Sequence, residues 1–148
     1  MSVELNHTIV HCRDNRESAA FLADLLGLTV GEEWGPFIPV VLANSVTLDF
    51  ATIPAASITP QHYAFLISEA EFDTAFARIQ ALGIDYFADP HQKIPGEINH
   101  NDGGRGVYFP DPSGHGMELI TRPYGGCSPP EEPPPGGGGG APRAPGGR

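Results

Sequence analysis

The chain has 148 residues, of which 40% are hydrophobic, enough for one domain with a sizeable core. Its 18 acidic and 8 basic residues give a formal net charge of −10, which argues against a nucleic-acid partner because such a partner requires a basic face. No apolar run is long enough to span a membrane and no secretion signal is evident, so we expect a cytoplasmic protein without a membrane partner.

Residues 3–53 predict a strand, a helix and three more strands. Asp14 and Glu17 resemble a capping box at the start of the helix, and Gly27 suits the position after its last turn. The apolar face of this helix consists of Ala19, Phe21, Leu22, Leu25 and Leu26. The four strands are expected at about 4–11, 28–34, 37–43 and 45–53.

Residues 61–122 repeat this order. Ser68 and Glu71 form a second capping box, and Gly83 ends the second helix. Its apolar face consists of Phe72, Phe76, Ile79 and Leu82. The strands are expected at about 62–68, 84–88, 106–110 and 116–122, with a long insertion at about 89–105. Because the first-strand histidine and the helix-ending glycine have nearly the same spacing in both halves, we expect an internal duplication.

Each half has a histidine on its first strand and a carboxylate on its last: His7 with Asp49, and His62 with Glu118. Strand alternation puts Asp49, His62 and Glu118 opposite the bulkier apolar residues that would pack under the helices. The first strand is less decisive, since Ile9 shares the face of His7. Taken singly, each residue has an ordinary structural role; the matching places favour a site for Fe²⁺, Mn²⁺, Zn²⁺ or Ni²⁺, which imidazoles and carboxylates bind.

Four segments carry a pattern of wider occurrence: Leu5-Asn-His7-Thr-Ile-Val, Phe21-Leu-Ala-Asp-Leu-Leu-Gly27-Leu, His62-Tyr-Ala-Phe-Leu-Ile and Phe109-Pro-Asp-Pro-Ser-Gly-His-Gly-Met-Glu118-Leu-Ile. They resemble the vicinal oxygen chelate superfamily, which includes glyoxalase I, bleomycin- and fosfomycin-resistance proteins and extradiol dioxygenases. The resemblance covers residues 3–122. It implies an α+β fold of two βαβββ modules that form a cup-shaped mixed sheet, with the helices on its outer face.

By position in this resemblance, His7, His62 and Glu118 match metal ligands, and Asp49 matches a fourth ligand of glyoxalase-type members. Glutamate is usual there, so the shorter Asp49 binds directly, through water or not at all. A metal site of His7, His62 and Glu118 alone favours Fe²⁺ and oxygenase chemistry. With Asp49 as a fourth ligand, the site favours Zn²⁺, Ni²⁺ or Mn²⁺ and lyase or isomerase chemistry. His11 stands where glyoxalase I often has an arginine, which argues against a glutathione-thioester substrate.

Three further residues are candidate catalytic groups, and each has an ordinary structural alternative. His100 is expected to be a general base, a hydrogen-bond donor to a metal ligand, or an ordinary loop histidine. Arg105 is expected either to hold a substrate carboxylate or to lie on the surface. Tyr108 is expected either to provide its hydroxyl at the site or to pack in the core. Trp34 and Phe37 either line the pocket or simply pack, and His115 is expected to be exposed.

The cysteines and the C-terminus complete the expected organisation. The domain is expected to span residues 1–124, followed by a disordered Pro/Gly-rich tail at 125–148. Cys12 should face the helices and Cys127 belongs to the tail, so a disulfide between them is not expected and a reducing compartment is favoured.

The leading hypothesis is a metal-dependent enzyme of the glyoxalase or dioxygenase type. It would chelate neighbouring oxygens of a small organic substrate and catalyse its isomerisation, lysis or oxygenation, and the resemblance implies a homodimer. The alternative is a metal-free, drug-sequestering binding protein that uses the same cup. A third hypothesis is a partner module recruited through the Pro-rich tail.

Overall fold

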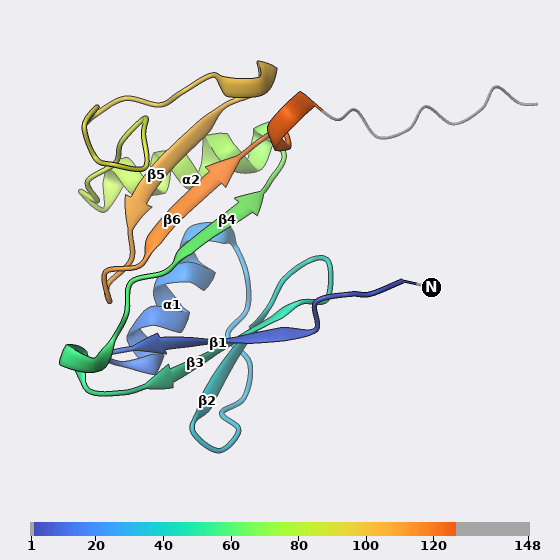
Figure 1. Ribbon diagram of the computed structural model, residues 1–148, viewed down its shortest axis with the longest axis vertical. Helices are drawn as coiled ribbons and strands as arrows, with labels where there is room; N and C mark the ends of the chain where they lie inside the picture. The colour runs from blue at the N-terminus through green and yellow to red at the C-terminus, as the bar shows by residue number, and fades with distance from the viewer. Residues whose placement is uncertain (1, 127–148) are drawn as a thin grey trace, which may run out of the picture.

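The computed structural model describes residues 2–126 (Figure 1). The tail from Cys127 onward lies outside the described residues, so the expected domain boundary and the expectation of disorder stay predictions. Within the described range, no helix has the length and apolar character needed to cross a membrane. The chain order is β1 (His7–Cys12), α1 (Asn15–Leu26), β2 (Phe37–Val41), β3 (Thr47–Thr52), β4 (His62–Leu66), α2 (Glu69–Ala81), β5 (Gly106–Pro110) and β6 (Gly116–Ile120).

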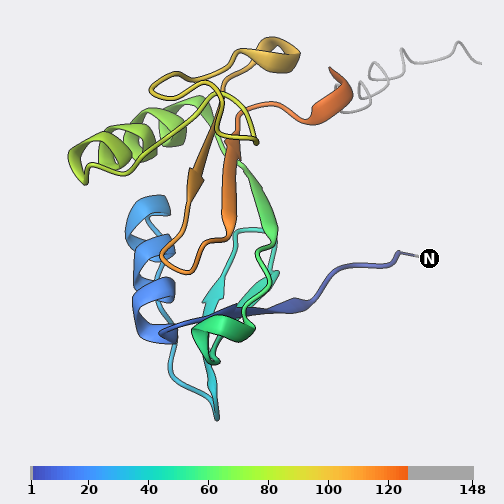
Figure 2. The same cartoon turned by 60° about the vertical axis from the view of Figure 1, so that its left-hand side comes forward.

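Two three-stranded mixed sheets have the same topology, with strand orders β1-β3-β2 and β4-β6-β5. In each sheet the first strand is parallel to the central strand and the third strand is antiparallel to it. The helices lie on the same side of the two sheets, which leaves the opposite face of each sheet uncovered by helix (Figure 2). The predicted α+β class is confirmed; below, residues 3–53 are called module 1 and residues 61–122 module 2.

The helices begin and end where the local sequence predicts. The Asp14 side chain accepts hydrogen bonds from the backbone of the first turn of α1, and Gly27, with a φ of 68°, ends that helix. At α2 the capping box between Ser68 and Glu71 is complete. The capping box of α1 is only half formed, because the Glu17 side chain forms an ion pair with Arg13 instead of accepting a hydrogen bond from the N-cap backbone.

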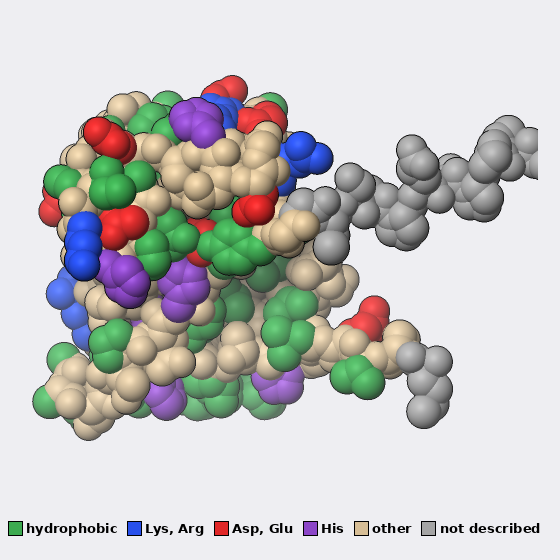
Figure 3. All heavy atoms as spheres, turned by 45° about the horizontal axis from the view of Figure 1, so that its top comes forward, with side chains coloured by type: hydrophobic (Ala, Val, Ile, Leu, Met, Phe, Trp, Pro, Cys, Tyr) green, Lys and Arg blue, Asp and Glu red, His purple; other side chains and the backbone are tan. Residues whose placement is uncertain are grey.

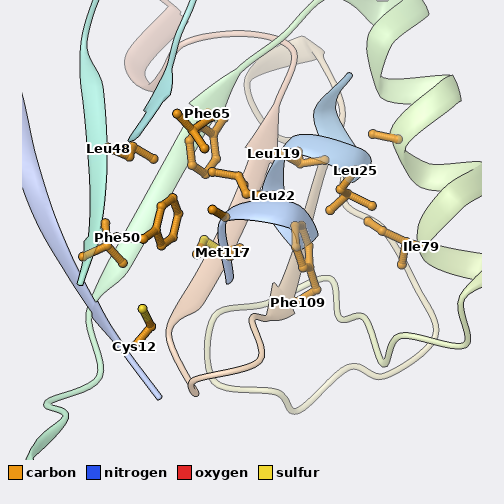
Figure 4. Packing of buried hydrophobic residues seen from close by; sticks show 14 of the residues in the cluster. Cys12, Leu22, Leu25, Leu48, Phe50, Phe65, Ile79, Phe109, Met117 and Leu119 are labelled. Carbon is orange, nitrogen blue, oxygen red and sulfur yellow. The ribbon is translucent and has the colours of Figure 1, made fainter. Parts of the chain in front are cut away.

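The two modules share one hydrophobic core, to which α1 contributes Leu22 and Leu25 (Figure 4). Strand alternation is confirmed: Val10, Leu48, Phe50, Phe65, Met117 and Leu119 point into the core. Cys12 does so as well, as predicted, with no exposed surface. Leu82 was predicted to belong to the apolar face of the second helix, but it caps that helix and is 65% exposed.

Two expected strands are reduced to isolated bridges. Residues 28–34 pair with β2 only at the bridges Val30–Val40 and Trp34–Phe37. Proline at position 39 has no N–H to donate to a ladder, so this edge of β2 cannot pair continuously. Residues 84–88 likewise pair only at Phe87, opposite Pro95 and Tyr108.

His115 joins the modules and is buried, so the expectation that it is exposed was wrong. Its ring Nδ1 accepts a hydrogen bond from the Gln61 backbone at 2.9 Å, which places the ring proton on Nε2. That Nε2 donates to the His11 carbonyl oxygen at 2.6 Å, at the end of β1. Both ring nitrogens of His115 are therefore hydrogen-bonded, and this imidazole connects the turn before β6 to module 1. Local sequence patterns do not predict such a contact.

Asp111 in the same turn should make stability depend on pH. One carboxylate oxygen accepts from the backbone of Ser113 and His115, whereas Oδ2 has no partner among residues 2–126, and burial raises the carboxyl pKa above 3.8. An acid with a raised folded-state pKa binds protons more tightly when folded, so its contribution to stability falls as pH rises from about 4 through the folded-state pKa.

We expect the unfolding free energy of Asp111→Asn, minus that of the wild type, to increase from pH 4 to pH 7, because only the wild type has the carboxyl with the raised pKa. Urea denaturation across this range measures the difference. Asp85→Asn, which changes an exposed carboxylate, is the control and should show no such trend. A pH-independent difference for Asp111→Asn would contradict the prediction.

Candidate metal centre

His62 and Glu118 lie side by side on the uncovered face of the second sheet. In the parallel register of β4 and β6, His62 pairs with Gly116 and Ala64 with Glu118. A Cβ on Gly116 would lie 3.3 Å from the His62 Nδ1, so glycine provides room for the imidazole. His62 Nε2 is 2.9 Å from Glu118 Oε1; the histidine side chain is 49% exposed, whereas that of the glutamate is 2% exposed.

Two tyrosines complete the surroundings of Glu118. Tyr108 is its register partner on β5, and the Tyr124 hydroxyl donates a hydrogen bond to Glu118 Oε2. The two phenol oxygens are 3.0 Å apart; because the Tyr124 proton points to the carboxylate, Tyr108 donates to Tyr124. Burial, the hydrogen bond to Tyr124 and the nearby charge of Glu118 hold the pKa of Tyr108 far above its usual value. The pKa of Tyr124 is also raised, by burial and by Glu118.

Strand alternation does not predict a role for Tyr124, because this residue lies beyond the last strand. Its position after Pro123, as the last aromatic residue before the Gly/Pro-rich tail, was the available signal. Only the fold shows that the chain turns back so that this side chain reaches Glu118.

Module 1 repeats the same arrangement without the contact. His7 pairs with Thr47 and Ile9 with Asp49, so the histidine and carboxylate have the register offset that His62 and Glu118 have in module 2. His7 Nδ1 instead lies 2.7 Å from Asn6 Oδ1. Within residues 2–126, no three His, Cys, Asp or Glu side chains form a metal-binding group. Histidines are accordingly spread over several parts of the face in Figure 3.

The donor set of module 2 fits a divalent cation. Glu118 is a buried carboxylate whose hydrogen-bond and ion-pair partners in the described part of the chain are an imidazole and a phenol, with no arginine or lysine. An imidazole nitrogen and a carboxylate oxygen at this separation are ligands that borderline divalent metals accept. Such a metal would supply the positive charge that a buried carboxylate requires.

The other two predicted catalytic residues lie apart from this pair. The Arg105 guanidinium forms ion pairs with Glu69 at 2.7 Å and Asp73 at 2.8 Å, and it stacks over the Phe72 ring on α2. His100 is exposed at the start of a short 3₁₀ turn at Asn101–Gly103. Tyr108 is thus the predicted catalytic residue that adjoins Glu118, and the roles assigned to Arg105 and His100 stay predictions.

Two aromatic side chains lie at the edge of the uncovered face of module 1. Trp34 and Phe37 stack with ring centroids 5.8 Å apart, and Trp34 is 72% exposed. Phe37 shares its strand face with Pro39, which pairs with Asp49, so the stack flanks the face that carries the module 1 carboxylate.

Comparison with known proteins places the chain in a family. The profile of the Glyoxalase/Bleomycin resistance protein/Dioxygenase superfamily matches residues 4–119. The chain is 27% identical to glutathione transferase FosA of Serratia marcescens over 126 residues, which cover 80% of this chain and 81% of FosA. It is 59% identical to the structure of oxidase ChaP-H2, with a TM-score of 0.83, covering 86% of this chain and all of that one.

A structure of the fosfomycin resistance protein FosX from Listeria monocytogenes, complexed with Mn(II), shares the fold. Its TM-score is 0.64 at 23% identity, and the match covers 84% of this chain and 94% of FosX. The profile match and the likeness to ChaP-H2 agree with the family resemblance of the sequence motifs. The chain therefore belongs to the Glyoxalase/Bleomycin resistance protein/Dioxygenase superfamily.

Proposed function

We propose that this protein is a divalent-metal-dependent enzyme whose metal site forms between module 1 of one copy and module 2 of a second copy. The observation that carries the proposal is the buried Glu118 carboxylate beside His62 Nε2, on the sheet face opposite α1 and α2. The matching pair in module 1, His7 and Asp49, has the same register but does not join this site within one chain. A two-fold dimer can bring the two faces together.

The uncovered faces themselves favour a homodimer. Ile9, Val41 and Leu66 share strand faces with the candidate ligands or with Phe37, and they are 46%, 55% and 60% exposed. In addition, β1 and β4 are edge strands of their sheets. Apolar side chains beside unpaired strand edges are features that a second chain covers in stable assemblies.

In this proposal His62 and Glu118 bind the metal together with His7 of the second copy, and Asp49 is the candidate fourth ligand. A divalent metal bound there supplies Lewis-acid catalysis, and iron would add redox chemistry with O₂. The hydroxyl of Tyr108 is protonated at neutral pH, and burial raises its pKa further, so Tyr108 would not act as a base. Its proton is used in the hydrogen bond to Tyr124, so its phenol oxygen can accept a hydrogen bond from a substrate.

We further propose oxidation of a small organic substrate with two neighbouring oxygens as the reaction. ChaP-H2, at 59% identity, is described as an oxidase. Anionic substrates such as a phosphonate or glutathione call for basic side chains, but Arg105 is paired with Glu69 and Asp73, and histidine stands at position 11. Lyase or isomerase chemistry at the same metal is the alternative within this proposal.

Metal analysis tests the proposal without knowledge of the substrate. The purified wild type should hold about one divalent metal ion per chain, as expected for two equivalent sites in a two-fold dimer. His62→Ala should lose this metal, whereas His91→Ala, which changes an exposed loop histidine, should keep it. Wild-type protein that binds no divalent metal, or His62→Ala that binds it unchanged, would refute the proposal.

The second candidate is a metal-free binding protein for small aromatic molecules. The exposed Trp34–Phe37 stack and the net charge of −10 favour this function for a cationic aromatic ligand. Calorimetric titration with such a ligand in the presence of a chelator distinguishes the two. Tight binding by protein that takes up no metal would favour this candidate.

A further inference from the structure

Tyr124 has a contact that the position of the residue does not predict. It lies in a short 3₁₀ turn (Tyr124–Gly126) four residues beyond β6, yet its hydroxyl donates to Glu118 Oε2 on that strand. This turn packs against the 3₁₀ turn Asn101–Gly103 of the long insertion. The insertion therefore supports the turn that follows β6, which lies beside it at the end of that strand (Figure 1).

The two oxygens of Glu118 have different partners. Oε1 lies 2.9 Å from His62 Nε2, and Oε2 accepts from Tyr124, which in turn lies 3.0 Å from the Tyr108 hydroxyl. A carboxylate whose second oxygen is held by a donor presents its first oxygen in one orientation. Donors behind metal-binding groups fix ligand orientation in this way.

We infer that Tyr124 is a positioning residue that holds Oε2 of Glu118, so that Oε1 and the His62 imidazole face the metal together. Tyr108 supports Tyr124 through the hydrogen bond between the two phenols. The inference rests on the proposed function, since it assigns Tyr124 to the same metal site. It also assigns the long insertion a task, which is to hold the turn that carries Tyr124.

The alternative is that Tyr124 serves only to pack its ring against the fold. The residue is 57% exposed, so little apolar surface is buried beneath its ring, and phenylalanine keeps whatever ring contacts exist. Loss of the hydroxyl should therefore affect the orientation of Glu118 much more than the stability of the fold.

Tyr124→Phe in the full-length protein tests the inference. The Kd for Mn²⁺, measured from the electron paramagnetic resonance signal of free Mn²⁺, should rise by about 10- to 100-fold. The visible absorption of bound Co²⁺ should also change, because it reports ligand geometry. Tyr86→Phe is the matched control: its hydroxyl lies 3.5 Å from Gln80 Nε2, away from Glu118, so both readouts should match the wild type.

The melting temperature without metal should be the same for Tyr124→Phe and the wild type. An unchanged Kd and Co²⁺ spectrum in Tyr124→Phe, with metal lost in His62→Ala, overturns the inference and leaves the proposed function standing. A lowered metal-free melting temperature that accounts for weaker binding also overturns it, in favour of a structural role. Wild-type protein that binds neither Mn²⁺ nor Co²⁺ overturns both proposals.

Discussion

Co-expressing His7→Ala with His62→Ala should restore metal binding that each variant lacks alone. If the ligands come from two chains, each variant homodimer has two broken sites. The mixed dimer has one site that lacks both histidines and one intact site. Random pairing makes half of the dimers mixed, so the mixture should bind about a quarter of the wild-type metal. Metal content of the purified mixture measures this, and oxidation of a substrate, once one is found, should recover in proportion.

The matched control pairs two variants of the same module. His62→Ala with Glu118→Gln damages module 2 in both chains, so no dimer has an intact site and no metal should return. Recovery in this control but not with His7→Ala would contradict a site shared between copies. Failure of both pairs, with each single variant lacking metal, would place all ligands within one chain, which the separation of the two pairs in residues 2–126 does not support.

Replacing Glu118 by glutamine should separate metal binding from folding. Glutamine keeps the shape and one carbonyl oxygen for the Tyr124 hydroxyl, but it removes the charge that holds a cation. We expect at least about a 100-fold loss of metal affinity, as for loss of a ligand or of groups directly behind it. Without metal, the variant should be as stable as the wild type or more so, because a buried carboxylate without a cation is costly.

Thermal denaturation with and without metal measures both effects, the loss of metal binding and the unchanged or higher stability of the metal-free variant. Excess Mn²⁺ at 100 times its Kd should stabilise the wild type by about 2.7 kcal/mol and leave Glu118→Gln unchanged. In the presence of a chelator, Glu118→Gln should melt at the same temperature as the wild type or at a higher one. Glu97→Gln, at an exposed position in the insertion, should behave as the wild type in both conditions. Equal stabilisation of Glu118→Gln by metal would contradict the assignment of Glu118 as a ligand.

Local patterns account for the features that the sequence predicted well. The capping residues Asp14 and Ser68 and the glycine after α1 act within a few residues of chain, so their signals survive in any tertiary context. Alternation placed His62 and Asp49 opposite the core because a strand has a fixed period of two. The expected strand at 28–34 failed where ladder pairing met Pro39, which has no N–H to donate, and residues 84–88 pair only at Phe87.

The sequence by itself therefore determined the duplicated α+β fold and the strand faces on which the candidate ligands lie, since both depend on periodicity and short-range capping. Tertiary structure alone decided which groups meet. It buried His115 between the modules, placed Tyr124 on Glu118 and kept the His7–Asp49 pair from joining His62. These outcomes depend on how segments far apart in the chain pack together, and such contacts have no local signature in the sequence.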